Sequence, residues 1–80
     1  MKNNVINYKE FADRINSLID QAGFSESEVA RYLSVTVQAV RKYKAGKSLP
    51  DPEHLLDLSE LLGVSVDYLL KGDGSTKVSS

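Results

Sequence analysis

Between residues 26 and 45, the apolar positions fall into two groups with helical spacing, separated by a short break. Helical spacing places the side chains of each group on one face of a helix. Two short helices joined by a tight turn would bring both groups to the inside of one corner. The apolar residues of this corner are Val29, Ala30, Leu33, Val35, Val40 and Tyr43. The pattern predicts a helix-turn-helix, an arrangement whose second helix can enter the major groove of DNA.

Capping residues and glycines predict where five short helices begin and end. Side-chain oxygens that can cap a first turn occur at Asn7, Ser25, Thr36, Asp51 and Ser65. Glycines that can end a helix occur at Gly23, Gly46, Gly63 and Gly72. Glu28 completes a Ser-x-x-Glu capping box, and Pro52 suits a first helical turn. We therefore expect a helical domain over residues 7–72, an N-terminal arm over residues 1–6, and a flexible tail or the start of a linker over residues 73–80.

The other three predicted helices carry apolar residues that can close a core around the corner. The stripe of the first helix consists of Phe11, Ile15, Leu18 and Ile19. The stripe of the fourth helix consists of Leu55, Leu58 and Leu62. The short fifth helix carries Val66, Tyr68, Leu69 and Leu70. Helices of this length are marginal alone, so packing must hold them. No alternating run of about 4–8 residues indicates a strand, and we expect a compact, all-α bundle of five short helices.

Charge is balanced over the chain but concentrated locally. The 80 residues carry a formal net charge of −1, yet no acidic residue occurs between Val29 and Pro50. The basic residues of that stretch are Arg31, Arg41, Lys42, Lys44 and Lys47. Taken alone, such a run is more often a solvated helix face than a binding site. Because it coincides with the predicted corner, we interpret it as a surface that attracts DNA phosphates.

The composition excludes several kinds of site. A hydrophobic content of 41% and a charged content of 26% are ordinary for one small globular domain. The absence of cysteine excludes disulfides, thiolate metal sites and cysteine nucleophiles. No apolar run approaches ~18 residues, and the N-terminus lacks the apolar region of a signal peptide. We expect a cytoplasmic protein that does not cross a membrane.

Four motifs of the chain match those of one known family: Gly23-Phe24-Ser25 before the second helix, Val29-Ala30 within it, Ala45-Gly46-Lys47-Ser48-Leu49-Pro50 after the third helix, and the ending Leu62 to Gly72. Through these motifs, the chain from about Phe11 to Gly72 resembles the phage-repressor and Cro-type helix-turn-helix domains, the Xre family. The resemblance implies a lambda-repressor-like fold with the helix-turn-helix formed by the second and third helices. It also implies a sequence-specific DNA-binding transcriptional regulator, a repressor that acts as a dimer on a pseudo-palindromic operator.

The resemblance assigns the DNA contacts to the third helix and its flanks. The implied base contacts are Val37, Gln38, Arg41 and Lys42. Gln and Arg side chains can pair bidentately with adenine and guanine, and the valine methyls suit a thymine methyl. The implied phosphate contacts are Thr36, Lys44, Lys47 and Ser48. Gln38, Arg41 and Lys42 could also simply face water, whereas Tyr43 lies in register with Val40 and is expected in the core.

Three departures from the family pattern bear on function. Glu26 stands where the family often has a phosphate-binding Gln, and its carboxylate would repel a phosphate. Ser34 stands where the family favours Gly, so a left-handed backbone there would carry a conformational cost. A first-helix Arg and a third-helix Glu, which pair in many members, are replaced by Ile19 and Lys44. We expect Lys44 to be free to reach a phosphate as a result.

Leftover apolar residues near the C-terminus predict a dimer interface. Leu56 and Leu61 lie off the stripe of the fourth helix, and the fifth helix is too short to bury all of its apolar residues. Family members commonly pair through this region, so we expect a weak homodimer around Val66 and Leu69. The alternative is that these two residues complete the core of the monomer.

Two other classes of function compete with DNA binding. The same fold could serve as a protein-interaction module that binds a second regulatory protein, which Glu26 and the acidic balance favour slightly. An enzyme is the weakest hypothesis, because the chain lacks cysteine, has one histidine and shows no catalytic constellation. We expect no cofactor and no metal, and we expect His54 on the surface, since one histidine without cysteine does not make an ordinary metal site.

Overall fold

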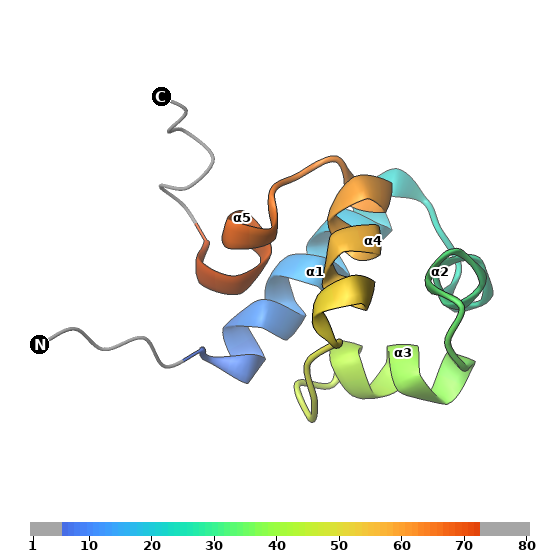
Figure 1. The fold of residues 1–80 in the computed structure, drawn as a ribbon, viewed down its shortest axis with the longest axis horizontal. Helices are drawn as coiled ribbons and strands as arrows, with labels where there is room; N and C mark the ends of the chain where they lie inside the picture. The colour runs from blue at the N-terminus through green and yellow to red at the C-terminus, as the bar shows by residue number, and fades with distance from the viewer. Residues whose placement is uncertain (1–5, 73–80) are drawn as a thin grey trace, which may run out of the picture.

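The computed structural model describes residues 6–72 and confirms the predicted all-α bundle of five short helices (Figure 1). The helices are α1 (Tyr8–Ala22), α2 (Glu26–Leu33), α3 (Val37–Lys44), α4 (Pro52–Leu62) and α5 (Val66–Lys71). The predicted tail and most of the predicted arm lie outside the described residues. In the view of Figure 1, α3 runs along the lower edge, with α2 beside its first turn and α4 rising from the segment that follows it.

Local capping explains why the helices begin where they do. Four of the predicted caps accept a hydrogen bond from a backbone N–H of the first turn: Asn7, Ser25, Thr36 and Ser65. The capping box is complete, since the Glu28 carboxylate also accepts the backbone N–H of Ser25 at 2.8 Å. Asp51 differs, because its side chain makes no capping hydrogen bond. Helix α4 begins there because Pro52 needs no N–H partner in a first turn.

The core joins side chains from all five helices around the predicted corner. Its largest fully buried side chains are Phe11, Ile15, Leu33, Leu58, Leu69, Val29 and Val40. Ala30 is only 4% exposed, which agrees with its expected place on the inside of the corner. Tyr43 is 7% exposed and lies in this core, as predicted, whereas Tyr32 is 48% exposed. His54, expected on the surface, is partly buried and keeps some accessible surface.

The C-terminal region corrects the predicted dimer interface. Leu69 has no exposed surface, because it belongs to the same buried cluster as Phe11, Ile15 and Leu58. Its predicted place in a dimer interface is therefore wrong, and the alternative, completion of the monomer core, holds for this residue. Val66 is only partly buried against the core and keeps some accessible surface.

Two polar side chains of α1 hold the ends of other helices. Arg14 donates from Nε to the Leu69 carbonyl at 3.0 Å and from Nη2 to the Leu70 carbonyl at 2.8 Å. These carbonyls lie near the end of α5, where helical partners run out. Asn16 donates from Nδ2 to the Lys44 carbonyl at 3.0 Å, at the end of α3. Helix α1 therefore holds both α5 and α3 through hydrogen bonds that no local sequence pattern predicts.

The turn between α2 and α3 contains a strained residue. Ser34 has φ 61° and ψ 44°, and it is the one non-glycine residue with positive φ in the described part of the chain. A left-handed conformation costs a residue with a Cβ roughly 1–2 kcal/mol, part of which glycine loses again through its greater freedom in the unfolded chain. Ser34 therefore has the left-handed backbone on which the expected conformational cost depends.

Ser34→Gly is therefore expected to stabilise the domain by up to about 1 kcal/mol in urea unfolding. Ser27→Gly is the matched control, because Ser27 is exposed within α2 and has an ordinary helical backbone. That control should destabilise the domain by about 0.5–1 kcal/mol. A lower unfolding midpoint for Ser34→Gly than for the parent would contradict the strain.

Candidate nucleic-acid interface

The buried face of α3 determines which of its side chains reach solvent. Val40 is 1% and Tyr43 is 7% exposed, so the opposite face of the helix points outward. Gln38, Arg41 and Lys42 are all exposed, and their i, i+3, i+4 spacing places them on one face. These three predicted base contacts are thus brought together on an accessible helix surface.

Val37 differs from the other three predicted base contacts. Its side chain is partly buried and packs against the hydrophobic core. Only part of its apolar surface therefore faces outward at the start of α3. The predicted contact with a thymine methyl would have to use that remaining surface.

The predicted phosphate contacts at the two ends of α3 are also accessible to different extents. Thr36 is exposed at the first turn, and its hydroxyl accepts the Ala39 N–H at 3.0 Å. Backbone N–H groups of a first turn lack helical partners and form an anion-binding end. Beyond the other end of the helix, Lys47 is exposed and Ser48 is partly buried. Neither Lys42 nor Lys47 forms an ion pair within residues 6–72.

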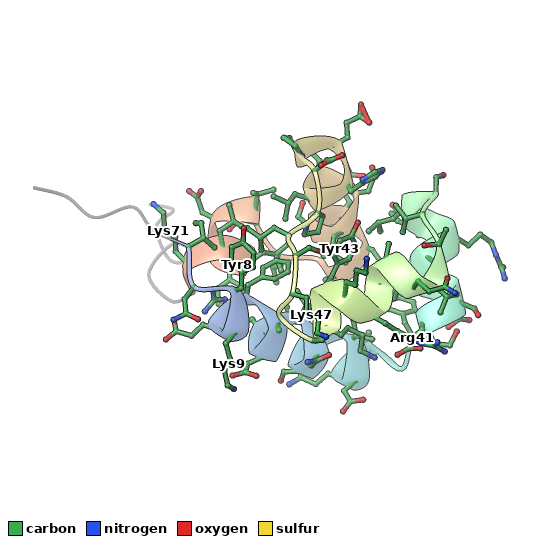
Figure 2. The ribbon with its side chains drawn as sticks, turned by 90° about the horizontal axis from the view of Figure 1, so that it is seen from below. Tyr8, Lys9, Arg41, Tyr43, Lys47 and Lys71 are labelled. Carbon is green, nitrogen blue, oxygen red and sulfur yellow. The ribbon has the colours of Figure 1, made fainter. Side chains whose placement is uncertain are left out.

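The tertiary fold places the start of α1 beside the segment that follows α3, a proximity that the sequence did not indicate. A Cβ placed on Gly46 would lie 3.4 Å from the Lys9 Cα, so the start of α1 lies against the segment after α3. Figure 2 looks onto α3 and shows Arg41 on the helix, Lys47 in the segment that follows, and Lys9 on the neighbouring α1. Among residues 6–72, the one ion-pair partner of Lys9 is the exposed Asp13, at 3.3 Å. This close approach places the backbone at the start of α1 beside the segment that follows α3.

Glu26 forms a network with two of the predicted DNA contacts. Arg41 donates from Nε to Glu26 Oε1 at 2.9 Å, and Lys44 donates from Nζ to Glu26 Oε2 at 3.2 Å. The hydrogen bond from Arg41, followed by that from Lys44, lowers the pKa of the Glu26 carboxyl. The acid that would repel a phosphate is therefore ionised and already paired with cations of α3.

This network corrects the expected role of Lys44. The sequence predicted that Lys44 is free to reach a phosphate, because the usual partner of its position is missing. Its Nζ instead donates a hydrogen bond to the Glu26 carboxylate, and the Lys44 side chain is only 27% exposed. The pairing joins residues 18 positions apart, so it depends on how α2 and α3 pack.

Tyr43 lies on the buried face of α3, opposite the exposed side chains. Burial, together with a smaller effect of the Asp51 charge, raises the pKa of the Tyr43 phenol. Its hydroxyl therefore stays protonated under ordinary conditions. Within the described residues, no group of three or more potential ligands is placed to hold a metal ion. Nor is any helix in that part of the chain long and apolar enough to span a membrane.

The arrangement agrees with known proteins in both sequence and structure. A helix-turn-helix family model matches residues 15–69. Over 62 residues, the chain is 42% identical to the SPbeta prophage-derived uncharacterized HTH-type transcriptional regulator YonR of Bacillus subtilis (strain 168). That match covers 78% of this chain and 57% of YonR, so the chain spans little more than half of that relative.

Two solved structures show the same fold. The P22 c2 repressor in complex with synthetic operator 9T matches with a TM-score of 0.76 and 30% identity, over 79% of this chain and 96% of that chain. A chain of the SinR protein/SinI protein complex matches with a TM-score of 0.70 and 27% identity, over 86% of this chain and 68% of that chain.

The chain therefore belongs to the helix-turn-helix family, as a phage-repressor and Cro-type DNA-binding domain. Its relatives are transcriptional regulators, and the family is a class of DNA-binding proteins rather than a class of enzymes. The resemblance seen in the sequence motifs is confirmed.

Proposed function

We propose that this chain is the operator-binding part of a transcriptional repressor and that it inserts α3 into the major groove. The observation that carries the proposal is the single exposed face of α3 that presents Gln38, Arg41 and Lys42. The core residues of the opposite face and the Asn16 contact at the end of α3 hold that helix in one orientation. A rigid helix with polar side chains in a row is what readout of base edges requires.

Each exposed group has a defined chemical task in this proposal. Gln38 pairs with adenine N6 and N7, whereas Arg41 or Lys42 pairs with guanine O6 and N7. The first-turn N–H groups after Thr36 and the side chains of Lys47 and Ser48 bind phosphates, which position the domain without reading sequence. Lys9 joins this phosphate-binding group through its place beside the segment after α3.

A two-fold homodimer supplies the specificity that one short helix lacks. Two copies of α3 would then read half-sites about 34–36 Å apart, on one face of the duplex. With Leu69 buried, the proposed dimer surface reduces to the accessible part of Val66 and its surroundings. Leu56, which is 53% exposed on α4, is a further apolar residue available to a partner copy.

A protein partner is the second candidate function. The similar chain in the SinR/SinI complex supports it, because that structure holds a second protein. The pairing of Glu26 with two cations also removes positive charge from the proposed DNA surface. In this alternative, the exposed face of the fold binds another regulator rather than a duplex.

Selection from a random duplex pool, followed by binding measurements over a range of salt concentrations, distinguishes the two candidates. We expect a two-half-site sequence with dyad symmetry. If a dimer neutralises about 4–8 phosphates, the log–log slope of affinity against salt should lie at roughly −4 to −7. No enriched sequence and a slope near zero would contradict DNA binding and favour the protein partner.

A further inference from the structure

The pairing of Glu26 with α3 places an acid inside a surface that is otherwise basic. No acidic residue occurs from Val29 to Pro50, the stretch that contains α3 and most of the basic residues of this surface. Glu26 is the first residue of α2, and both of its carboxylate oxygens accept hydrogen bonds from α3. Its side chain is 33% exposed, so it is accessible to whatever approaches this surface.

The hydrogen bond from Arg41 to Glu26 leaves the Nη end of the guanidinium available to a DNA base. Arg41 uses Nε for Glu26, at 2.9 Å, and its Nη groups have no acceptor in the part of the chain that the structure describes. The guanidinium is planar, so a bond at Nε restricts the direction in which both Nη groups point. The Arg41 side chain is 63% exposed, which leaves this end open to a base.

The hydrogen bond from Lys44 to Glu26 has the opposite effect, because it makes the Lys44 ammonium group less available to DNA. Lys44 is partly buried, and its Nζ lies 3.2 Å from the second oxygen of Glu26. Any phosphate that approached Lys44 would compete with a carboxylate already in place and would be repelled by it. Glu26 thus reduces the attraction that this part of α3 exerts on DNA of any sequence.

We propose that Glu26 is a specificity-determining residue of the DNA-binding surface: it directs Arg41 toward a guanine and offsets positive charge that would otherwise strengthen binding to all sequences. Glu26 acts through Arg41 and Lys44, so it is a positioning residue rather than a base contact. The inference rests on the proposed function, because it concerns how the same surface discriminates among duplexes.

Two substitutions separate the two effects of Glu26. Glu26→Gln keeps an oxygen that can accept the Arg41 Nε–H but removes the charge, whereas Glu26→Ala removes both. Glu60→Gln is the matched control, because it removes one negative charge from an exposed position at the end of α4 farthest from α3 (Figure 1). Binding is measured on the selected duplex, on the same duplex with each guanine replaced in turn, and on random DNA.

Glu26→Gln should bind random DNA roughly three- to tenfold more tightly at about 0.1 M salt, with a salt slope steeper by about 1. It should keep the guanine preference of the parent. Glu26→Ala should show the same gain on random DNA, but its preference for guanine at one position should fall by about fivefold or more. Glu60→Gln should behave like the parent in both measurements.

The affinity for random DNA and the preference for guanine each test one part of the proposal. Glu26→Gln with unchanged affinity and salt slope would remove the charge effect, and Glu26→Ala with full guanine preference would remove the orienting effect. A lower unfolding midpoint with unchanged DNA binding would reduce Glu26 to a structural link between α2 and α3. The Arg41 Nε–H resonance, followed without DNA, checks the link itself: it should shift in Glu26→Ala and stay near the parent position in Glu26→Gln.

Binding by the parent protein keeps this test distinct from the test of function. If the parent selects no duplex, the proposed function itself fails. If the parent selects a sequence and the Glu26 variants match it, only the role of Glu26 fails.

Discussion

Leu69→Ala is expected to lower the free energy of unfolding by about 2–5 kcal/mol. Leu69 has no exposed surface and belongs to the same buried cluster as Phe11 and Leu58. Removing its branched end would leave a cavity that the two neighbouring helices, α1 and α4, cannot fill. A domain of this size has only a small margin of stability, so much of it would be unfolded at physiological temperature. Urea unfolding followed by circular dichroism measures the loss.

Val66→Glu is the matched control for Leu69→Ala, because Val66 is only partly buried on the same short helix. It should cost less stability and should shift the free protein toward the monomer in sedimentation experiments, if Val66 lies in the proposed dimer surface. Leu69→Ala should cost more stability than Val66→Glu and should have less effect on the monomer–dimer equilibrium. A Leu69→Ala variant that keeps full stability but loses dimers would restore Leu69 to the interface.

Gln38→Ala is expected to weaken binding to the selected operator by about 1–3 kcal/mol and to relax the preference at one base pair. Gln38 is exposed in the first turn of α3, beside Arg41 and Lys42 on the same face. Its amide can donate to and accept from a single adenine, so its loss should be felt only where that adenine stands. Binding to a set of operators with one changed base pair each gives the position.

Lys47→Ala is the matched control for Gln38→Ala. Lys47 is exposed beyond the end of α3 and is proposed to bind a phosphate, which is the same in every sequence. Its loss should weaken selected and random duplexes alike and reduce the magnitude of the salt slope by roughly 1. Equal losses on all sequences for Gln38→Ala would remove that residue from base readout.

Local sequence signals were sufficient to predict where the helices begin and which faces they bury. The caps at Asn7, Ser25, Thr36 and Ser65 form where their residue types predicted them, because each cap involves groups within three residues. For Ser34, the family resemblance raised a left-handed turn as a condition, and the structure meets it with φ 61°. Helical periodicity likewise indicated that Val40 and Tyr43 face inward, which in turn exposes Gln38, Arg41 and Lys42.

Contacts between residues far apart in the chain could not be predicted in this way. The burial of Leu69, the contact of Asn16 with the end of α3, and the pairing of Glu26 with Lys44 all join different helices. The sequence predicted Lys44 to be unpaired and Leu69 to be accessible, and both predictions were wrong. A helical period identifies the face that a side chain occupies but not the helix that covers it or the charge that lies opposite, since both depend on how the helices pack.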